Sequence, residues 1–121
     1  MNNQDIEAIM KKLIEEFPDF ISKIQPDDMQ PYMLFGDFGI YIRNGIDNNY
    51  FNEAELARIF NFLNVMGSST QDEIHNLLTV GVLEILTDSK MAVKIAKNKL
   101  TAGALEDFNA IEKFWYGGAE E

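Results

Sequence analysis

Few side chains in this sequence are suited to catalysis. The 121 residues include no cysteine and one histidine, His75, so the chain has no thiolate nucleophile, disulfide or thiolate metal ligand. His75 stands near Asp72 and Glu73 without a second histidine at metal-ligand spacing, which makes a poor metal site. The hydroxyls of residues 68–70 lack a nucleophile-elbow context, and no glycine-rich phosphate loop is present. The sequence therefore predicts no enzyme, no metal and no cofactor, and His75 is interpreted as a polar surface residue.

Glu84 is an acid inside a strongly apolar segment, residues 80–86. A buried carboxylate must be hydrogen-bonded, paired with a cation or protonated. We therefore expect Glu84 to be a buried structural acid that bonds a backbone N–H, a hydroxyl or a Lys or Arg of another helix. A solvent-facing position and a functional position are the alternatives. An enzyme that used Glu84 with His75 would need one pocket containing both side chains.

The chain is strongly acidic, with 20 Asp and Glu against 10 Lys and Arg and a net charge of -10. This charge argues against binding to nucleic acid or to an anionic membrane, and it favours a basic protein partner or solubility alone. Acids near helix starts are favoured by the helix dipole without any partner. The functional alternative is that they gather along one edge as an acidic surface that speeds encounter with a basic partner. The candidate partner-binding residues are Asp27, Asp28, Asp37, Asp47, Glu53, Glu55, Asp72 and Glu73.

The lysines are concentrated after residue 88. Lys90, Lys94 and Lys97 recur at i, i+4 and i+7, so they share one face of an expected helix. A solvated face is the simpler interpretation, and a small contact with an anion or a nucleic acid is the alternative.

Apolar residues recur at helical spacing along most of the chain, and the β signal is poor. One such stripe in residues 6–17 predicts the first helix, and Pro18 ends it or opens a short second helix. Pro31 suits the first turn of a helix over residues 31–43, and the composition of residues 44–49 predicts a loop. The stripe residues that we expect to be buried are Ile6, Met10, Leu13 and Phe17.

A capping box is predicted at the start of a helix over residues 52–67. Asn52 is followed three residues later by Glu55, and Phe51 and Leu56 stand at the two positions of a hydrophobic staple. These local signals predict that Asn52 is the N-cap of this helix.

A second capping box, Thr70 with Glu73, precedes a segment over residues 70–86 that is apolar on most faces. We expect this helix to be the most buried element. The short connection at residues 67–69 predicts that it forms an antiparallel hairpin with the helix before it.

Asp88 or Ser89 is expected to open a basic helix, and Thr101 the last helix. The fold class is therefore all-α, a single domain over residues 1–121 with five or six helices and a frayed tail at 116–121. The helices are expected to pack as an irregular bundle or as a short stack of antiparallel hairpins. We see no signal peptide or membrane span and expect a cytoplasmic protein.

Three stretches of the sequence carry a resemblance to a known family: residues 31–36, 59–64 and 76–86. Together they are similar to an uncharacterised family of small bacterial proteins found among the immunity-type proteins of polymorphic toxin systems. The resemblance implies an intracellular protein that binds and neutralises a toxin domain. It implies no catalytic residues.

The leading functional hypothesis is a non-enzymatic, acidic protein-binding domain, of immunity type, that occludes a basic toxin domain. A helical adaptor that binds another protein, or itself through Tyr50 or Trp115, is the alternative. An enzyme of unknown reaction is the third. A toxin-bearing gene immediately upstream would favour the first hypothesis, and a pocket that joins His75 to Glu84 would favour the third.

Overall fold

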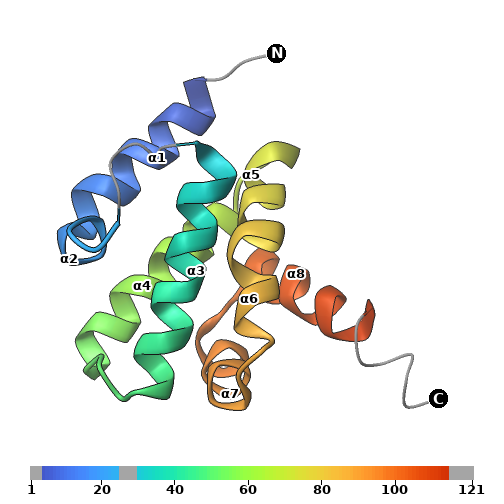
Figure 1. Ribbon diagram of the computed structural model, residues 1–121. Helices are drawn as coiled ribbons and strands as arrows, with labels where there is room; N and C mark the ends of the chain where they lie inside the picture. The colour runs from blue at the N-terminus through green and yellow to red at the C-terminus, as the bar shows by residue number, and fades with distance from the viewer. Residues whose placement is uncertain (1–3, 25–29, 115–121) are drawn as a thin grey trace.

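The computed structural model describes residues 4–24 and 30–114, and all regular structure in these residues is helical (Figure 1). Three consecutive elements form one unbroken helix, here called the α5–α6 helix: α5 (Asp72–Asn76), the π-helical stretch η1 (Leu77–Leu83) and α6 (Glu84–Leu86). The other helices are α1 (Gln4–Glu16), α2 (Pro18–Ile21), α3 (Pro31–Asp47), α4 (Glu53–Gly67), α7 (Lys90–Lys99) and α8 (Ala102–Glu112).

The all-α prediction is confirmed. The described residues contain seven helices rather than five or six, because the single turn after Pro18 is a helix of its own. The predicted frayed tail at 116–121 lies outside the described residues.

The first two helices bury the predicted apolar stripe. Leu13 is fully buried and Phe17 nearly so, whereas Ile6 and Met10 are partly buried against the same core. Phe17 has a non-helical backbone, and Pro18 occupies the first turn of α2, where its missing N–H costs no intrahelical bond. The sequence therefore predicted both the stripe and the break between the helices.

The helix α3 is longer than predicted, because residues 44–47 are helical and not part of a loop. Gly45 lies directly under the ring of Phe51, and a side chain at this position would collide with that ring. The chain turns only after Asp47, where the backbone N–H and side-chain amide of Asn48 both donate to the Asn44 carbonyl. Packing of Phe51 thus overrides the local loop signal.

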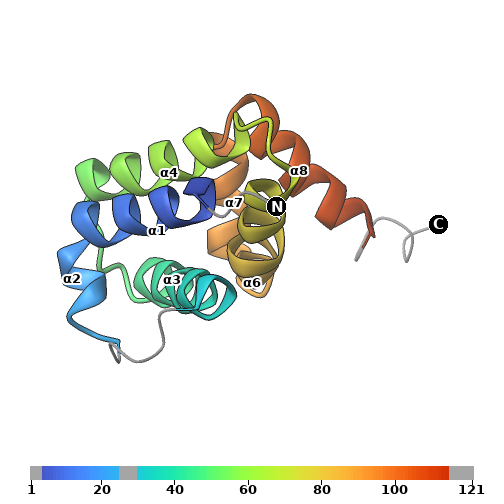
Figure 2. The ribbon, with the colours of Figure 1, turned by 90° about the horizontal axis from the view of Figure 1, so that it is seen from above.

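The most extensive helix–helix interface joins α3 to the α5–α6 helix. The two helices run side by side in the same direction (Figure 1), and both are seen nearly end-on from above (Figure 2). Glycines allow this close approach: a Cβ on Gly39 would lie 3.0 Å from the carbonyl oxygen of Gly81, and a Cβ on Gly81 would lie 2.9 Å from the Cβ atom of Phe35. The α5–α6 helix is also the most buried one, as predicted, with Leu77, Leu78, Val82, Leu83 and Leu86 fully buried.

The prediction that α4 and the α5–α6 helix form a hairpin is wrong. Seen from above, α4 lies across the direction of α6 instead of along it (Figure 2), and its main neighbour is α8. Gly67 at the end of α4 packs directly on the backbone of Gly103 and Ala104 at the start of α8. Asn64 adds two hydrogen bonds at the same crossing, because its amide donates to the Lys99 carbonyl (3.2 Å) and its carbonyl accepts from the Thr101 N–H (2.8 Å).

One of the two predicted capping boxes is present. The Asn52 side chain accepts from the Glu55 N–H (2.8 Å), and the Glu55 carboxylate accepts from the Asn52 N–H (2.9 Å). Thr70 is not a cap, because Gln71 is the N-cap residue of α5 and its side chain makes no capping bond. The turn before α5 is instead closed by the Ser69 hydroxyl, which accepts from the Gln71 N–H (3.0 Å).

The core is rich in phenylalanine where α1 and α2 meet α3 and α4. The rings of Phe17, Phe38 and Phe62 pack with centroids 5.1 to 6.0 Å apart, close to the favoured spacing of aromatic pairs. The same cluster continues through Phe20 to Tyr41 at the surface. Within the described residues, no helix is long and apolar enough to cross a membrane.

Candidate binding groove

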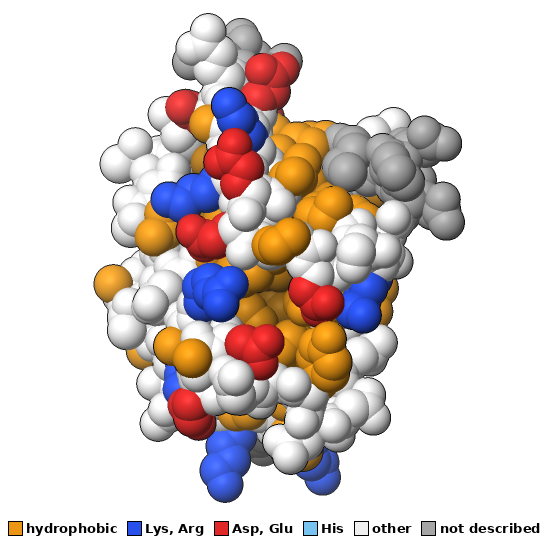
Figure 3. Space-filling view, turned by 90° about the vertical axis from the view of Figure 1, so that its left-hand side faces the viewer, with side chains coloured by type: hydrophobic (Ala, Val, Ile, Leu, Met, Phe, Trp, Pro, Cys, Tyr) orange, Lys and Arg blue, Asp and Glu red, His pale blue; other side chains and the backbone are white. Residues whose placement is uncertain are grey.

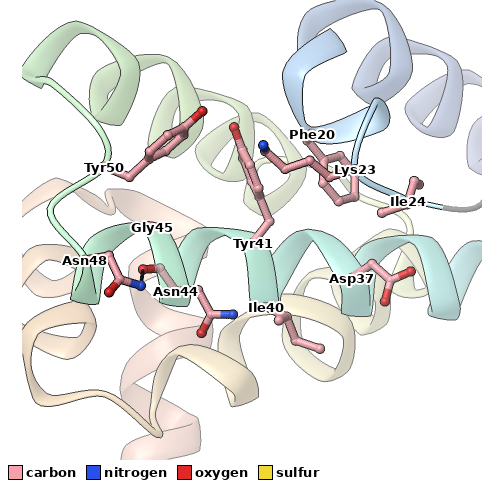
Figure 4. A pocket seen from close by; sticks show the side chains of 10 residues that line it. All are labelled: Phe20, Lys23, Ile24, Asp37, Ile40, Tyr41, Asn44, Gly45, Asn48 and Tyr50. Carbon is pink, nitrogen blue, oxygen red and sulfur yellow. Dashed lines mark hydrogen bonds between the residues drawn. The ribbon is translucent and has the colours of Figure 1, made fainter.

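An open groove of about 590 Å³ follows one side of α3. Figure 4 shows it extending along the helix from Asp37 at one end to Asn48 and Tyr50 at the other, with the segment after α2 as the facing wall. The residues that α3 and the turn after it contribute recur at intervals of three and four, so they share one helix face. The groove is lined by Phe20, Lys23, Ile24, Asp37, Ile40, Tyr41, Asn44, Gly45, Asn48 and Tyr50.

Aromatic packing holds two tyrosines at this groove. The half-buried ring of Tyr41 lies between those of Phe20 and Phe51, at centroid distances of 5.2 and 5.3 Å. Tyr50 packs edge-on against Phe51 at 5.4 Å but is 52% exposed. The core therefore positions both rings, while one face of Tyr50 is left uncovered by the core.

Both tyrosines donate their hydroxyl groups to one carboxylate oxygen, Oδ2 of Asp19, at 2.8 Å from Tyr41 and 3.1 Å from Tyr50. The Tyr41 hydrogen bond, supported by that of Tyr50, holds the pKa of Asp19 below its ordinary 3.8. Burial and the bond to Asp19 raise the pKa of Tyr41, and the bond to Asp19 raises that of Tyr50. At neutral pH the carboxylate is therefore charged and both hydroxyl groups are protonated donors.

A lysine of this chain occupies the open face of Tyr50. The Nζ atom of Lys23, in the segment after α2, lies 5.7 Å from the centroid of the Tyr50 ring, within the range of a cation–π contact. Figure 4 shows the lysine side chain reaching toward Tyr41 and Tyr50 from the opposite wall. The groove thus already holds one cation against its aromatic end.

The sequence model of one family, a domain of unknown function (DUF7674), matches residues 10–116. The chain belongs to this family. The match covers all the groove-lining residues, α3 and the α5–α6 helix. No curated protein and no solved structure matches the chain. The match shows membership in an uncharacterised family, whereas the immunity-type assignment is not part of the family's description and stays a prediction.

Three of the eight acids proposed to bind a partner lie in two separate places within the described residues. Asp37 lines the groove. Asp72 and Glu73 lie in the first turn of α5, where the helix dipole favours them. Asp27 and Asp28 lie outside the described residues.

The other three acids have partners within the chain. Asp47 accepts a hydrogen bond of 2.5 Å from the hydroxyl of Ser89, and Glu53 pairs with Lys99 at 3.1 Å. Glu55 completes the capping box of α4. Because α4 begins at the lower left of Figure 1 and α5 at the upper right, Glu53 and Glu55 are far from the acids of α5. Among the described residues, the proposed acids therefore do not gather along one edge.

The surface charge on one face is mixed. Figure 3 shows the left-hand side of Figure 1, where acidic and basic side chains alternate around exposed apolar ones. A uniform acidic surface is therefore absent from this face, and any charge selectivity must come from particular sites.

Glu84 is half-buried and not buried as expected. Its carboxylate makes no hydrogen bond or ion pair to the described residues, since the only side-chain contact at this residue is the Thr87 hydroxyl on its backbone carbonyl (2.6 Å). The π-helical stretch before Glu84 has more residues per turn than an α-helix, and this turns Glu84 away from the buried face of the helix. Access to water removes the need for a partner, so the interpretation as a buried structural acid is wrong.

The lysine face of α7 is partly paired. Lys97 forms an ion pair with Glu112 of α8 at 2.7 Å, whereas Lys90 and Lys94 are exposed. This arrangement agrees with the simpler interpretation, a solvated face. Of the two residues expected to open this helix, Asp88 and Ser89, it is Ser89 that is the N-cap and accepts from the Ala92 N–H.

His75 is less simple than the sequence indicated. Its Nδ1 lies 2.7 Å from Oδ2 of Asp107 on α8, and its Nε2 lies 2.7 Å from the carbonyl oxygen of Ser69. Both neighbours are acceptors, so the doubly protonated ring satisfies both, and the Asp107 bond, followed by that of Ser69, raises the pKa of His75. Neither His75 nor Glu84 lines the groove, and the described residues contain no cluster of metal ligands.

Proposed function

We propose that this protein is a non-enzymatic binding domain that holds an extended segment of a protein partner in the groove along α3. The observation that carries the proposal is the shape of the groove. It follows α3 from Asp37 to Asn48, which is roughly 16 Å at 1.5 Å per helical residue. About five residues of extended chain span this length.

The chemistry of the lining supports a peptide occupant. Ile40 is 41% exposed and Tyr50 52% exposed, so each offers apolar area to a partner side chain. Asn44 and Asn48 offer amide donors and acceptors for a peptide backbone. Exposed tyrosine with apolar and amide neighbours is typical of protein-recognition surfaces, in which aromatic residues contribute most of the affinity.

The partner that fits best is a basic protein, and we propose a toxin domain that is occluded in the cytoplasm. The net charge of -10 and the charged carboxylate of Asp19 favour positive charge at the groove. The resemblance to immunity-type proteins supports the choice of a toxin. The mechanism is steric, because a segment held in the groove places the bulk of this domain over the partner's active cleft.

The test begins with a search for a toxin-bearing gene immediately upstream of the gene for this chain, and the toxin domain found there serves as the binding partner. Ile40→Arg places a charge and a long side chain in the groove, and we expect binding measured by calorimetry to weaken at least about tenfold, with loss of toxin protection in cells. Val65→Arg on α4 is the matched control, because Val65 is 49% exposed and lies outside the groove. Equal binding by both variants, or binding of neither the parent nor the variants, contradicts the proposal. A parent that only self-associates in solution would favour the adaptor instead.

A further inference from the structure

Lys23 makes only part of the contact that a cation can make at the Tyr50 end of the groove. Its ammonium lies over the aromatic ring, but the ion pairs of the described residues do not include one between Lys23 and Asp19. Lys23 is itself exposed and stands next to no other described cation of the groove. Its ammonium therefore contacts the Tyr50 ring without a direct ion pair to Asp19, although its charge acts on that carboxylate.

Asp19 offers a second contact beside that ring. Its Oδ2 accepts from Tyr41 and Tyr50, so the carboxylate is held at the edge of the Tyr50 ring. Its Oδ1 accepts no hydrogen bond from the described residues, and Asp19 is exposed. A positioned carboxylate with one open oxygen thus lies next to an exposed aromatic face.

A guanidinium group matches this pair of features better than an ammonium group. It is planar and stacks on an aromatic ring, and its N–H groups in the same plane can donate to a neighbouring carboxylate. We propose that the Tyr50 end of the groove binds an arginine side chain of the partner, which stacks on Tyr50, donates to Asp19 and takes the place of Lys23. This inference rests on the proposed function of the groove and specifies the chemistry that it recognises.

Displacement of Lys23 also makes the groove more negative, which favours a cationic partner. With Lys23 seated on the ring, its positive charge offsets the nearby carboxylates. Once it swings into solvent, a partner cation at the aromatic end experiences the Asp19 carboxylate without this offset. Lys23 therefore acts as an internal competitor, and partners without a suitably placed arginine are disfavoured.

The test is an NMR titration of the whole protein with N-acetyl-arginine amide, with N-acetyl-citrulline amide as the uncharged probe of the same shape. We expect saturable shifts of the Tyr41 and Tyr50 ring protons, with a dissociation constant that is roughly millimolar for one charged side chain, and at least about tenfold weaker binding of the citrulline probe. Equal binding of the two probes, or arginine shifts that lie outside the groove, would overturn the inference.

Two pairs of variants make the test specific. Lys23→Met should tighten arginine binding by about two- to fivefold, since it removes one cation–π competitor, whereas Lys94→Met, at an exposed lysine of α7, should not. Tyr50→Leu should weaken binding at least about threefold, whereas Tyr32→Leu should not, because Tyr32 is 49% exposed on α3 and outside the groove. Unchanged affinity in both Lys23→Met and Tyr50→Leu contradicts the arginine site.

Failure of this inference can be told apart from failure of the proposed function. If Ile40→Arg abolishes partner binding while the arginine probe does not bind, the groove is a docking site and only its arginine specificity is wrong. If the arginine probe binds in the groove but the toxin domain does not bind the parent, the cation site stands and the proposed partner is wrong.

Discussion

His75 on α5 and Asp107 on α8 are joined by a contact of 2.7 Å between Nδ1 and Oδ2, although 32 residues separate them in the chain. The second ring nitrogen contacts the Ser69 carbonyl, so one imidazole ring joins α8, α5 and the turn before α5. The protonated ring donates to both acceptors. Its charged form is therefore favoured in the folded protein, and the pKa of His75 is raised above its ordinary 6.5.

A raised pKa makes stability depend on pH in a defined direction. The contribution of His75 to the free energy of unfolding is fully present below about pH 6.5, the unfolded value, and is lost as the pH rises through the higher folded value. We expect Asp107→Asn to be less stable than the parent near pH 6 and the difference to shrink toward pH 9. Urea unfolding of both proteins between pH 6 and pH 9 measures this difference in stability. A difference that grows with pH would show that the ring is not held as the imidazolium.

The hydrogen bond from Tyr41 to Asp19 predicts the effect of removing one hydroxyl group. Tyr41 is the largest cause of the low pKa of Asp19, and Tyr50 is a smaller one. Tyr41→Phe should therefore raise the pKa of Asp19 toward its ordinary value, and Tyr50→Phe should raise it less. Titration of the Asp19 carboxyl carbon by NMR measures both changes. The reverse order, or no change in either variant, would mean that the carboxylate is not held by the two hydroxyl groups.

Most of the helices could be predicted because their signals are local. The apolar stripe around Leu13, the prolines at 18 and 31 and the capping box of Asn52 each act within one or two turns of the chain. The end of α3 could not be predicted in this way. Residues 44–49 have the composition of a loop, but Phe51 folds back onto Gly45 and extends the helix through Asp47. A tertiary contact therefore decides where this helix ends.

The candidate site was less predictable than the fold. The sequence indicates Tyr50 only as a self-association surface, and it marks neither Tyr41 nor Asp19 as a site residue. The hydrogen bonds from Tyr41 and Tyr50 to Asp19 span 22 and 31 residues. The spacing of residues along the sequence predicts contacts within a helix or turn, and it does not predict contacts between residues so far apart. The acids near helix starts were visible in the sequence, but Asp47 and Glu53 bond to Ser89 and Lys99, which only the folded chain brings near. Local patterns thus identified charged residues without showing which of them are available.

Two glycines, one at the contact between α4 and α8 and one on α3, are predicted to respond in opposite ways to substitution by alanine. A Cβ on Gly67 would collide with the backbone of Ala104, so Gly67→Ala should push the two helices apart and cost about 1–3 kcal/mol. A Cβ on Gly36 in α3 would meet nothing closer than the Gly81 carbonyl oxygen at 4.0 Å. Gly36→Ala should therefore stabilise the protein by roughly 0.5–1 kcal/mol through helix propensity. Chemical unfolding of the two variants measures this difference, and equal shifts in the same direction would contradict the close helix crossing.

The two predicted capping boxes provide a matched pair of substitutions, because the sequence pattern is the same and the structures differ. Asn52 makes the bond to the N–H of Glu55, so Asn52→Ala should lower the free energy of unfolding by about 0.5–2 kcal/mol. Thr70 precedes the true N-cap of α5 and caps nothing, so Thr70→Ala should stay within about 0.5 kcal/mol of the parent. Urea unfolding at pH 7 compares the two variants directly. If Thr70→Ala were the more costly change, α5 would begin one residue earlier in solution, and the turn held by Ser69 and His75 would have to be different.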